Sequence, residues 1–372
     1  MTERGLLLAS PLRDELTAFL EPRAADVDEG RADVRGGLRF VHGRSLEGDE
    51  RDPNADLVHV AETIATVAWS DLATAFSLWC HRMVLEYLPL APAASPSRRE
   101  LLPSLLRLDR FGSTGLASAM GHLLTGAPLP IAARGDDGAV VLDGKVRWAS
   151  NLFAPDFVVV TASAGADGGQ PFVVALPGDT PGLRVEPYPP LLALQATASS
   201  SIALEGVRIS PDRVLRWELA PFLHRVRPTF LILQSAFCWG LARRALDEAA
   251  GAIAPGSVLA TDLGPLEGRA ATLASSLRAA AALAASRRAA GATGPTDARD
   301  LVTLRLEAAR LATEAVALEL KALGSRAYVR SSSTARRLRE AAFLPIQAPT
   351  EAQLRAELAA ADRREQHDLA AV

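Results

Sequence analysis

The chain has 372 residues and a formal net charge of −3, with acidic and basic residues mixed along its length. This length predicts two or three domains, and the charge pattern offers no basic surface for nucleic acid and no polybasic membrane anchor. No run of about 18 apolar residues predicts a membrane span. Cys80 and Cys238 are the only cysteines, which argues against a disulfide framework or a cysteine metal site. We expect a soluble, cytoplasmic protein without a metal.

The first third of the chain predicts an N-terminal helical domain, residues 1–110. Apolar residues recur at helical spacing over residues 5–22 and 55–88, with a break near Ser70. Residues 25–53 are rich in Gly, Asp and Arg and lack periodicity, so they predict a loop.

The middle of the chain, residues 111–221, predicts a small antiparallel β barrel or sandwich. Short runs rich in β-branched residues begin at Phe157, Pro171 and Ser199, and Gly/Pro turns separate them. Evenly spaced short strands of this kind are typical of small all-β domains.

The last third, residues 222–372, predicts a C-terminal helical bundle. Its helices are long, rich in Ala and Leu, and joined by short Gly/Pro breaks. The expected helices cover residues 222–250, 266–290, 297–323, 334–344 and 350–362.

Three stretches in this order resemble the acyl-CoA dehydrogenase superfamily. Trp148-Ala-Ser-Asn, after Asp143-Gly-Lys, is similar to that family's Gly-Lys-x-Trp-Ile-(Thr/Ser)-Asn signature. Gly240-Leu-Ala-Arg-Arg-Ala-Leu-Asp-Glu-Ala resembles the first helix of its C-terminal domain, and Arg337-Leu-Arg-Glu-Ala resembles its Arg-Asp-Ala region. The resemblance covers nearly the whole chain and implies an α+β multidomain fold with a β domain between two helical ones.

The resemblance also implies bound FAD, an acyl-thioester or related small-molecule substrate, and a homodimer or homotetramer. Trp148 and Ala149 would form an apolar wall for the flavin, and Ser150 would donate to the ring near N5. An ungapped match places Ser118 at the threonine that binds the flavin's pyrimidine edge, although Ala119 and Met120 replace the Glu and Pro that follow in the family.

This sequence lacks several other residues that contact the cofactor in the family. Its Gln-x-x-Gly-Gly-x-Gly segment, whose backbone amides approach the pyrophosphate, corresponds to Lys321-Ala-Leu-Gly-Ser-Arg-Ala, so that Gly324 and Ser325 keep a tight turn. The family's Arg-x-x-Phe-Gly is absent from residues 256–260.

The residue that would remove the substrate's α-proton is missing. The ungapped match puts the family's catalytic Glu at Ala348, and the alternative position on the first C-terminal helix falls on Phe230. A positioned base contributes about 10²- to 10⁴-fold to such a reaction. Glu351 is the nearest substitute, but after Thr350 it is better explained as the first turn of a capped helix.

Three hypotheses follow. The first is a flavoprotein oxidoreductase that acts on the CH–CH group of an acyl thioester or related molecule, with its base unidentified. The second is a flavin-dependent monooxygenase on the same fold, which needs no α-proton base. The third is a catalytically degenerate paralogue that serves as a partner or binding subunit.

Overall fold

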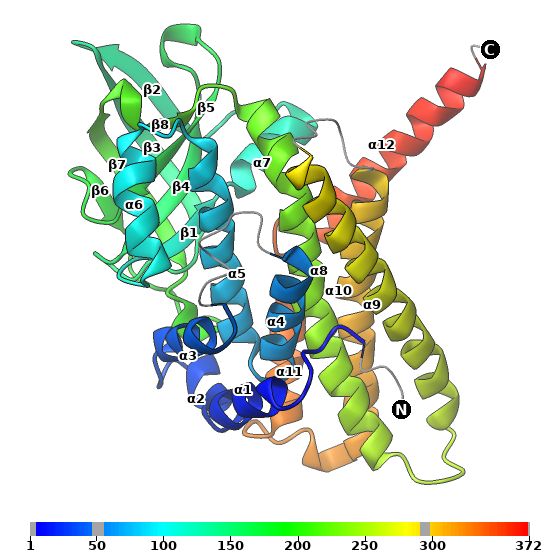
Figure 1. The fold of residues 1–372 in the computed structure, drawn as a ribbon. Helices are drawn as coiled ribbons and strands as arrows, with labels where there is room; N and C mark the ends of the chain where they lie inside the picture. Colours follow the sequence, from blue (N-terminus) through cyan, green and yellow to red (C-terminus); the bar gives the residue numbers. More distant parts are fainter. Residues whose placement is uncertain (1–4, 47–55, 291–297, 371–372) are drawn as a thin grey trace.

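The structure, a computed structural model, describes residues 5–46, 56–290 and 298–370. Two helical parts flank a middle part of two four-stranded sheets, and the sheets lie beside one end of the long helices (Figure 1). The predicted order of helices, strands and helices is confirmed. Within the described residues, no helix is both long and apolar enough to cross a membrane.

The described residues of the N-terminal part include six α-helices, of which α4 and α5 are the most deeply buried. Their bounds are α1 Leu12–Leu20, α2 Ala24–Asp28, α3 Val34–Val41, α4 Leu57–Ser70, α5 Leu72–Tyr87 and α6 Pro96–Leu106. The predicted break near Ser70 is confirmed, because α4 ends there and the Asp71 carboxylate caps α5 by accepting from the Thr74 N–H at 3.2 Å.

The predicted loop over residues 25–53 is wrong for its first part, which contains α2 and α3. The Asp33 side chain starts α3 by accepting from the Arg35 N–H at 2.9 Å, and Leu38 fixes the helix in the core. Val34, Leu38 and Val41 of α3 are buried and lie at helical spacing, but the Gly, Asp and Arg residues around them obscure this short pattern in the sequence. Tertiary burial stabilises helices as short as these. Residues 47–53 of the predicted loop lie outside the described residues.

The middle part is a sandwich, as predicted. Its strands are β1 Phe111–Gly115, β2 Ile131–Asp136, β3 Ala139–Ala149, β4 Phe157–Ser163, β5 Phe172–Pro177, β6 Leu183–Val185, β7 Ser200–Ile209 and β8 Val214–Arg216. One sheet has the order β1-β4-β5-β8 and the other β2-β3-β7-β6. All pairs are antiparallel except β1 with β4, which are parallel because a long crossover that begins with α7 (Ala117–Thr125) separates them.

Strand β4 joins the sandwich to the helices. Val158 and Val160 belong to the core shared with the helices, whereas Phe157 and Val159 belong to the core between the sheets. Successive side chains of a strand point to opposite faces, so a strand that is covered on both faces is apolar throughout. This explains the unbroken run of β-branched residues in β4.

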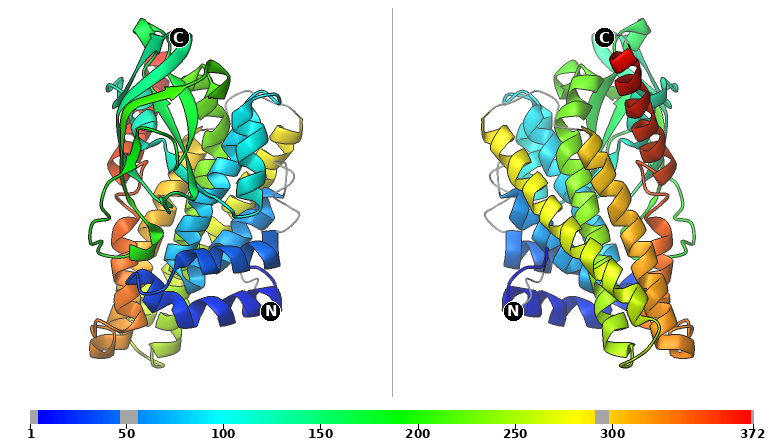
Figure 2. Two further views of the ribbon diagram at one scale, coloured as in Figure 1. Left: turned by 90° about the vertical axis from the view of Figure 1, so that its left-hand side faces the viewer. Right: turned by 90° about the vertical axis from the view of Figure 1, so that its right-hand side faces the viewer.

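The C-terminal part is a bundle in which α8, α9 and α10 lie side by side (Figure 2). Its helices are α8 Leu219–Ala252, α9 Ala260–Ala289, α10 Ala298–Leu323, α11 Ser333–Phe343 and α12 Glu351–Ala370. Gly240 lets α8 approach α4 closely, since an added Cβ would lie 2.2 Å from the Ala65 carbonyl oxygen. The glycine of the predicted helix motif therefore serves helix packing.

Asn151, directly after β3, ties the sandwich to the N-terminal helices. Its fully buried amide donates to the Ser77 carbonyl of α5 at 2.8 Å and to the Gly112 carbonyl of β1 at 3.0 Å. Its φ of 62° turns the chain away from β3. Asparagine tolerates this left-handed conformation better than most residues.

We predict that Asn151→Gly lowers the free energy of unfolding by about 1–3 kcal/mol, because two buried hydrogen bonds are lost. Glycine adopts the same φ without strain, so the loss reports the hydrogen bonds. Urea unfolding measures the effect. The control Glu205→Gln, on a side chain that is 74% exposed, should change stability by less than about 0.5 kcal/mol. Equal stability of the two variants would contradict the role given to Asn151.

Candidate cofactor and substrate site

A cavity of about 520 Å³ lies where the sandwich meets the helices. It is lined by α5, α8, α11, the end of β3, the segment 191–199 and the segment 346–348. Four of its aromatic residues pack edge to face or stacked on one another, namely Phe76, Trp79, Phe230 and Phe343. The volume and the mostly apolar lining are those of a site for a small organic molecule.

The end of β3 forms one wall of this cavity through Trp148, Ala149 and Ser150. Trp148 lines the cavity with 46% of its surface exposed, and Ala149 and Ser150 are buried beside it. The pairing of β3 with β7 is irregular between Val146 and Ala149. An irregularity of this kind re-aims side chains near a functional site.

Three hydroxyl groups lie in a row behind this wall. The Ser150 Oγ lies 2.6 Å from the Ser199 Oγ, and the Ser199 Oγ lies 2.7 Å from the Thr197 Oγ1. Thr197 donates to the Leu194 carbonyl at 2.8 Å. All three hydroxyl residues are buried and line the cavity.

Asp28 holds two walls of the cavity together. Its carboxylate accepts from the Leu194 N–H at 2.9 Å and from the Arg339 Nη2 at 2.5 Å. Leu194 belongs to the segment 191–199, and Arg339 belongs to α11. Because the Asp28 side chain is only 1% exposed, both partners are needed to stabilise its charge.

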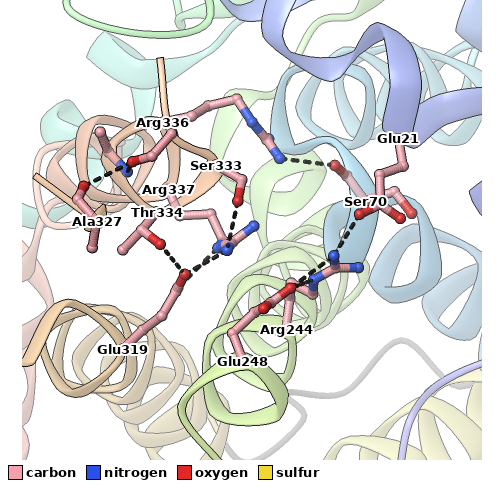
Figure 3. Close-up of polar contacts among 12 residues, drawn as sticks. Glu21, Ser70, Arg244, Glu248, Glu319, Ala327, Ser333, Thr334, Arg336 and Arg337 are labelled. Carbon is pink, nitrogen blue, oxygen red and sulfur yellow. Dashed lines mark hydrogen bonds and ion pairs between the residues drawn. The ribbon is translucent and has the colours of Figure 1, made fainter. Parts of the chain in front are cut away.

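Helix α11 is anchored by further buried ion pairs (Figure 3). Arg337 pairs with Glu319 of α10 through its Nε at 2.9 Å, and Thr334 donates to the same carboxylate at 2.5 Å. Arg336 donates to the Ser70 carbonyl at 3.2 Å and pairs with Glu340 at 2.7 Å. Burial raises the pKa of Glu340, an effect that the charge of Arg336 opposes. These contacts fix the helix that carries Arg339 and Phe343 into the cavity.

The residue that the sequence resemblance matches to the catalytic base lies in the cavity, but it is not an acid. Ala348 lines the cavity, and its carbonyl accepts from the Gln234 Nε2 at 3.0 Å. Among the described residues that line the cavity, none is Asp or Glu. Glu351 lies at the start of α12, pairs with Arg310 at 3.0 Å and does not line the cavity. Phe230, at the alternative position for the base, is part of the apolar wall.

A buried arginine that the sequence analysis did not identify lies behind the segment 346–348. Arg305 of α10 is 1% exposed and donates to the Gln234 Oε1 at 3.1 Å, the Gln347 Oε1 at 3.0 Å and the Leu344 carbonyl at 3.1 Å. No carboxylate of the described residues forms an ion pair with it. The Gln347 Nε2 is buried without a hydrogen-bond partner. Since the Gln347 Oε1 is occupied by Arg305, this amide offers only donors to a ligand.

Three of the predicted cofactor residues lie elsewhere. Ser118 is half-buried on α7 and does not line the cavity, whereas its neighbours Thr114 and Ala117 do. Gly324 and Ser325 form an exposed turn after α10, away from this cavity. The structure therefore brings together Trp148, Ala149, Ser150, Phe230 and Ala348 but not Ser118, Gly324, Ser325 and Glu351.

The Cys80 thiol and a second cavity have structural explanations and need no role in catalysis. Burial raises the pKa of the cavity thiol, Cys80, so it stays protonated near neutral pH.

A second cavity of about 870 Å³ lies between α1, α4, α8 and α9, and its charged residues pair with one another. It also borders Gly5, which follows undescribed residues. Across the described part of the chain, no group of three or more His, Cys, Asp or Glu side chains is placed to hold a metal ion.

Solved structures of flavoenzymes share this arrangement, in which a sheet sandwich packs on a helical bundle. No family model and no curated protein matches the chain. Butyryl-CoA dehydrogenase from Megasphaera elsdenii matches with a TM-score of 0.76 at 14% identity, over 95% of this chain and 99% of that one. The nitrososynthase from Micromonospora carbonacea var. africana matches with a TM-score of 0.77 at 18% identity, over 96% and 98%.

The FMN-bound structure of the dibenzothiophene monooxygenase TdsC from Paenibacillus sp. A11-2 matches with a TM-score of 0.76 at 17% identity, over 94% of this chain and 95% of that one. The chain therefore has the acyl-CoA dehydrogenase fold, as predicted. Its neighbours include dehydrogenases and a monooxygenase, so the fold by itself does not choose between these reactions.

We predict that Arg339→Met destabilises the protein by about 3–5 kcal/mol, because the Asp28 carboxylate is left buried without a counter-charge. The double variant Asp28→Asn/Arg339→Met should recover much of this loss, since a neutral amide can still accept from the Leu194 N–H. Urea unfolding of the three proteins measures the coupling. If the double variant is as unstable as the sum of the single variants, the two residues act independently and the pairing does not hold the site.

Proposed function

We propose that this protein is a flavin-dependent oxidoreductase, of the acyl-CoA dehydrogenase type, that binds FAD in the cavity at Trp148. The observation that carries the proposal is the wall made by Trp148, Ala149 and Ser150, which occupies the cavity at the positions that the sequence resemblance assigns to the flavin ring. A flat apolar wall with hydroxyl groups at its edge suits a tricyclic ring with polar nitrogen atoms. Bound flavin would supply the acceptor for the substrate's electrons.

The residues around the cavity fit the ring better than the rest of the cofactor. Aromatic and hydroxyl side chains are present at the wall, whereas Gly324 and Ser325 lie apart in an exposed turn. We propose that these two residues approach the pyrophosphate of FAD held by another copy of the chain in a homodimer or homotetramer. The exposed Tyr328 and Val329 next to this turn support such an interface. We place the protein in the cytoplasm.

The substrate is proposed to be an acyl thioester or a related small molecule with a carbonyl group. Gln347 supports this, because its Nε2 lacks a partner and its other end is fixed by Arg305. The buried positive charge strengthens the amide as a donor to a carbonyl oxygen. The aromatic side chains of α5 and α8 would contact the apolar part of the substrate and exclude water.

A second candidate is a flavin-dependent monooxygenase. The specific observation in its favour is that no described residue lining the cavity is an acid, so removal of an α-proton has no evident base. Monooxygenation of an apolar substrate has no need of that base. A third candidate, a degenerate paralogue that acts as a partner or binding subunit, remains the conclusion if the protein takes up no flavin.

We predict that the purified chain binds FAD and shows flavin absorbance, and that Trp148→Ala weakens binding by about 2- to 12-fold through loss of ring stacking. Titration of the protein with FAD, and in parallel with FMN, measures both effects. Trp217→Ala is the control, because Trp217 is also half-exposed but lies outside the cavity. Its ring packs on that of Phe172, with the two ring centroids 5.3 Å apart. A chain that binds neither flavin would exclude both oxidoreductase candidates.

We predict that Ala348→Glu increases the anaerobic rate at which an acyl-CoA bleaches the bound flavin by about 10²-fold or more, because it adds a proton acceptor where the family has one. Ala342→Glu, which puts a carboxylate on the cavity wall formed by α11, is the control and should give no such gain. Stopped-flow absorbance measures the rates.

Wild-type bleaching as fast as that of Ala348→Glu would show that a base is already present. Oxygen uptake driven by a flavin reductase, without any bleaching by acyl-CoA in either protein, would favour the monooxygenase.

A further inference from the structure

The row of hydroxyl groups behind the cavity wall has a fixed direction. Thr197 Oγ1 lies 2.8 Å from the Leu194 carbonyl oxygen. A carbonyl oxygen has no proton, so the hydroxyl must supply the one between them. The Thr197 N–H also donates to this carbonyl at 3.1 Å, but its proton does not lie between the two oxygen atoms. Leu194 is 4% exposed and Thr197 is fully buried, so bulk water does not reach the space between them.

The direction passes along the row, because each hydroxyl has a single proton. Because the Thr197 hydroxyl donates its proton to the Leu194 carbonyl, Thr197 can only accept from Ser199, whose Oγ lies 2.7 Å away. Ser199 has then used its own proton and can only accept from Ser150 across 2.6 Å. The opposite order would leave two oxygen lone pairs facing each other at the Leu194 carbonyl, which is unfavourable in a buried site.

Ser150 therefore gives its proton to Ser199 and offers only lone pairs to the cavity. This corrects the role of hydrogen-bond donor that the sequence resemblance implied for it. We propose that this row makes Ser150 an acceptor that selects a ring bearing an N–H group, so that the site binds reduced flavin more tightly than oxidised flavin. The inference rests on the proposed flavin site.

The chemistry of the ring supports this selection. Oxidised flavin has a bare nitrogen at N5, which accepts a hydrogen bond, whereas reduced flavin carries N5–H, which donates one. With N5 at Ser150, the position that the sequence resemblance implies, an acceptor-only hydroxyl would favour the second form and disfavour the first. Ser199 contacts Ser150, and Thr197 contacts Ser199, so both act through Ser150 as positioning residues.

One hydrogen bond gained, against one unfavourable contact, should make reduced flavin bind about 10-fold more tightly than oxidised flavin. By linkage, a 10-fold preference raises the two-electron midpoint potential of the bound flavin by about 30 mV relative to free flavin. Both quantities are equilibrium properties and require no substrate turnover.

The test is an anaerobic titration of the full-length protein with oxidised FAD and with dithionite-reduced FAD, read by quenching of tryptophan fluorescence. Ser199→Ala removes the acceptor of the Ser150 proton, so that Ser150 can donate, and the preference should fall to about one or reverse. Thr197→Val should reduce the preference in the same direction, and Thr197→Ser should restore it.

Ser200→Ala is the matched control. Ser200 is the next residue and is also buried, and its hydroxyl lies within hydrogen-bond distance of the carbonyls of Glu186 and Pro187, at 2.9 and 3.0 Å, away from the cavity. It should keep the wild-type preference. The midpoint potential of the wild-type protein is a second measurement that needs no variant to fold.

The outcomes separate the two proposals. Tighter binding of oxidised flavin by the wild type, or an unchanged preference in folded Ser199→Ala, overturns the hydroxyl inference and leaves the proposed flavin function standing. Failure to bind either form of FAD overturns both.

Discussion

The structure depends on the buried amide of Asn151, which connects the end of β3 to α5 and β1. Three residues before it stands Trp148, and one residue before it stands Ser150. The hydrogen bonds of Asn151 therefore place the polar and flat wall of the sandwich opposite the aromatic face of α5. Apolar contacts between the two surfaces lack direction, so polar contacts of this kind fix their relation, together with the bond from the Gly112 N–H to the His81 Nδ1 at 3.0 Å.

Buried charges give the opposite side of the cavity its geometry. Asp28, Glu319 and Glu340 each neutralise an arginine of α11, and all three carboxylates are almost inaccessible to solvent. Arg305 differs, because its partners are amide and carbonyl oxygens. The charged residues on this side thus hold α11 in place and polarise Gln347. No described residue that lines the cavity is Asp or Glu. An apolar cavity without an acid is a poor place to remove a proton from carbon, but a good place to keep water from a bound ring.

The same fold accommodates dehydrogenases and monooxygenases among the solved structures that this chain resembles. What distinguishes members of such a fold is the set of side chains on the cavity wall. In this chain that set combines acceptor-only hydroxyls at Ser150 with a donor-only amide at Gln347. Ser150 would accept a hydrogen bond from an N–H group of a ring, whereas Gln347 would donate one to an oxygen atom of a second molecule. Such a pair suits a site that binds a cofactor and a substrate together.

The sequence by itself determined the order of the three parts, most long helices and the β-rich middle, because helical and strand periods are local properties. Trp148, Ala149, Ser150 and Ala348, which the resemblance named, line one cavity, and their functional roles stay a prediction. The tertiary structure decided the rest. The short helices α2 and α3 are stabilised by burial against the other helices, and Arg305, Gln234 and Gln347 come together from three separate segments. The direction of the hydroxyl row depends on where the Leu194 carbonyl lies. Such contacts follow from the packing of distant segments, which local sequence patterns do not encode.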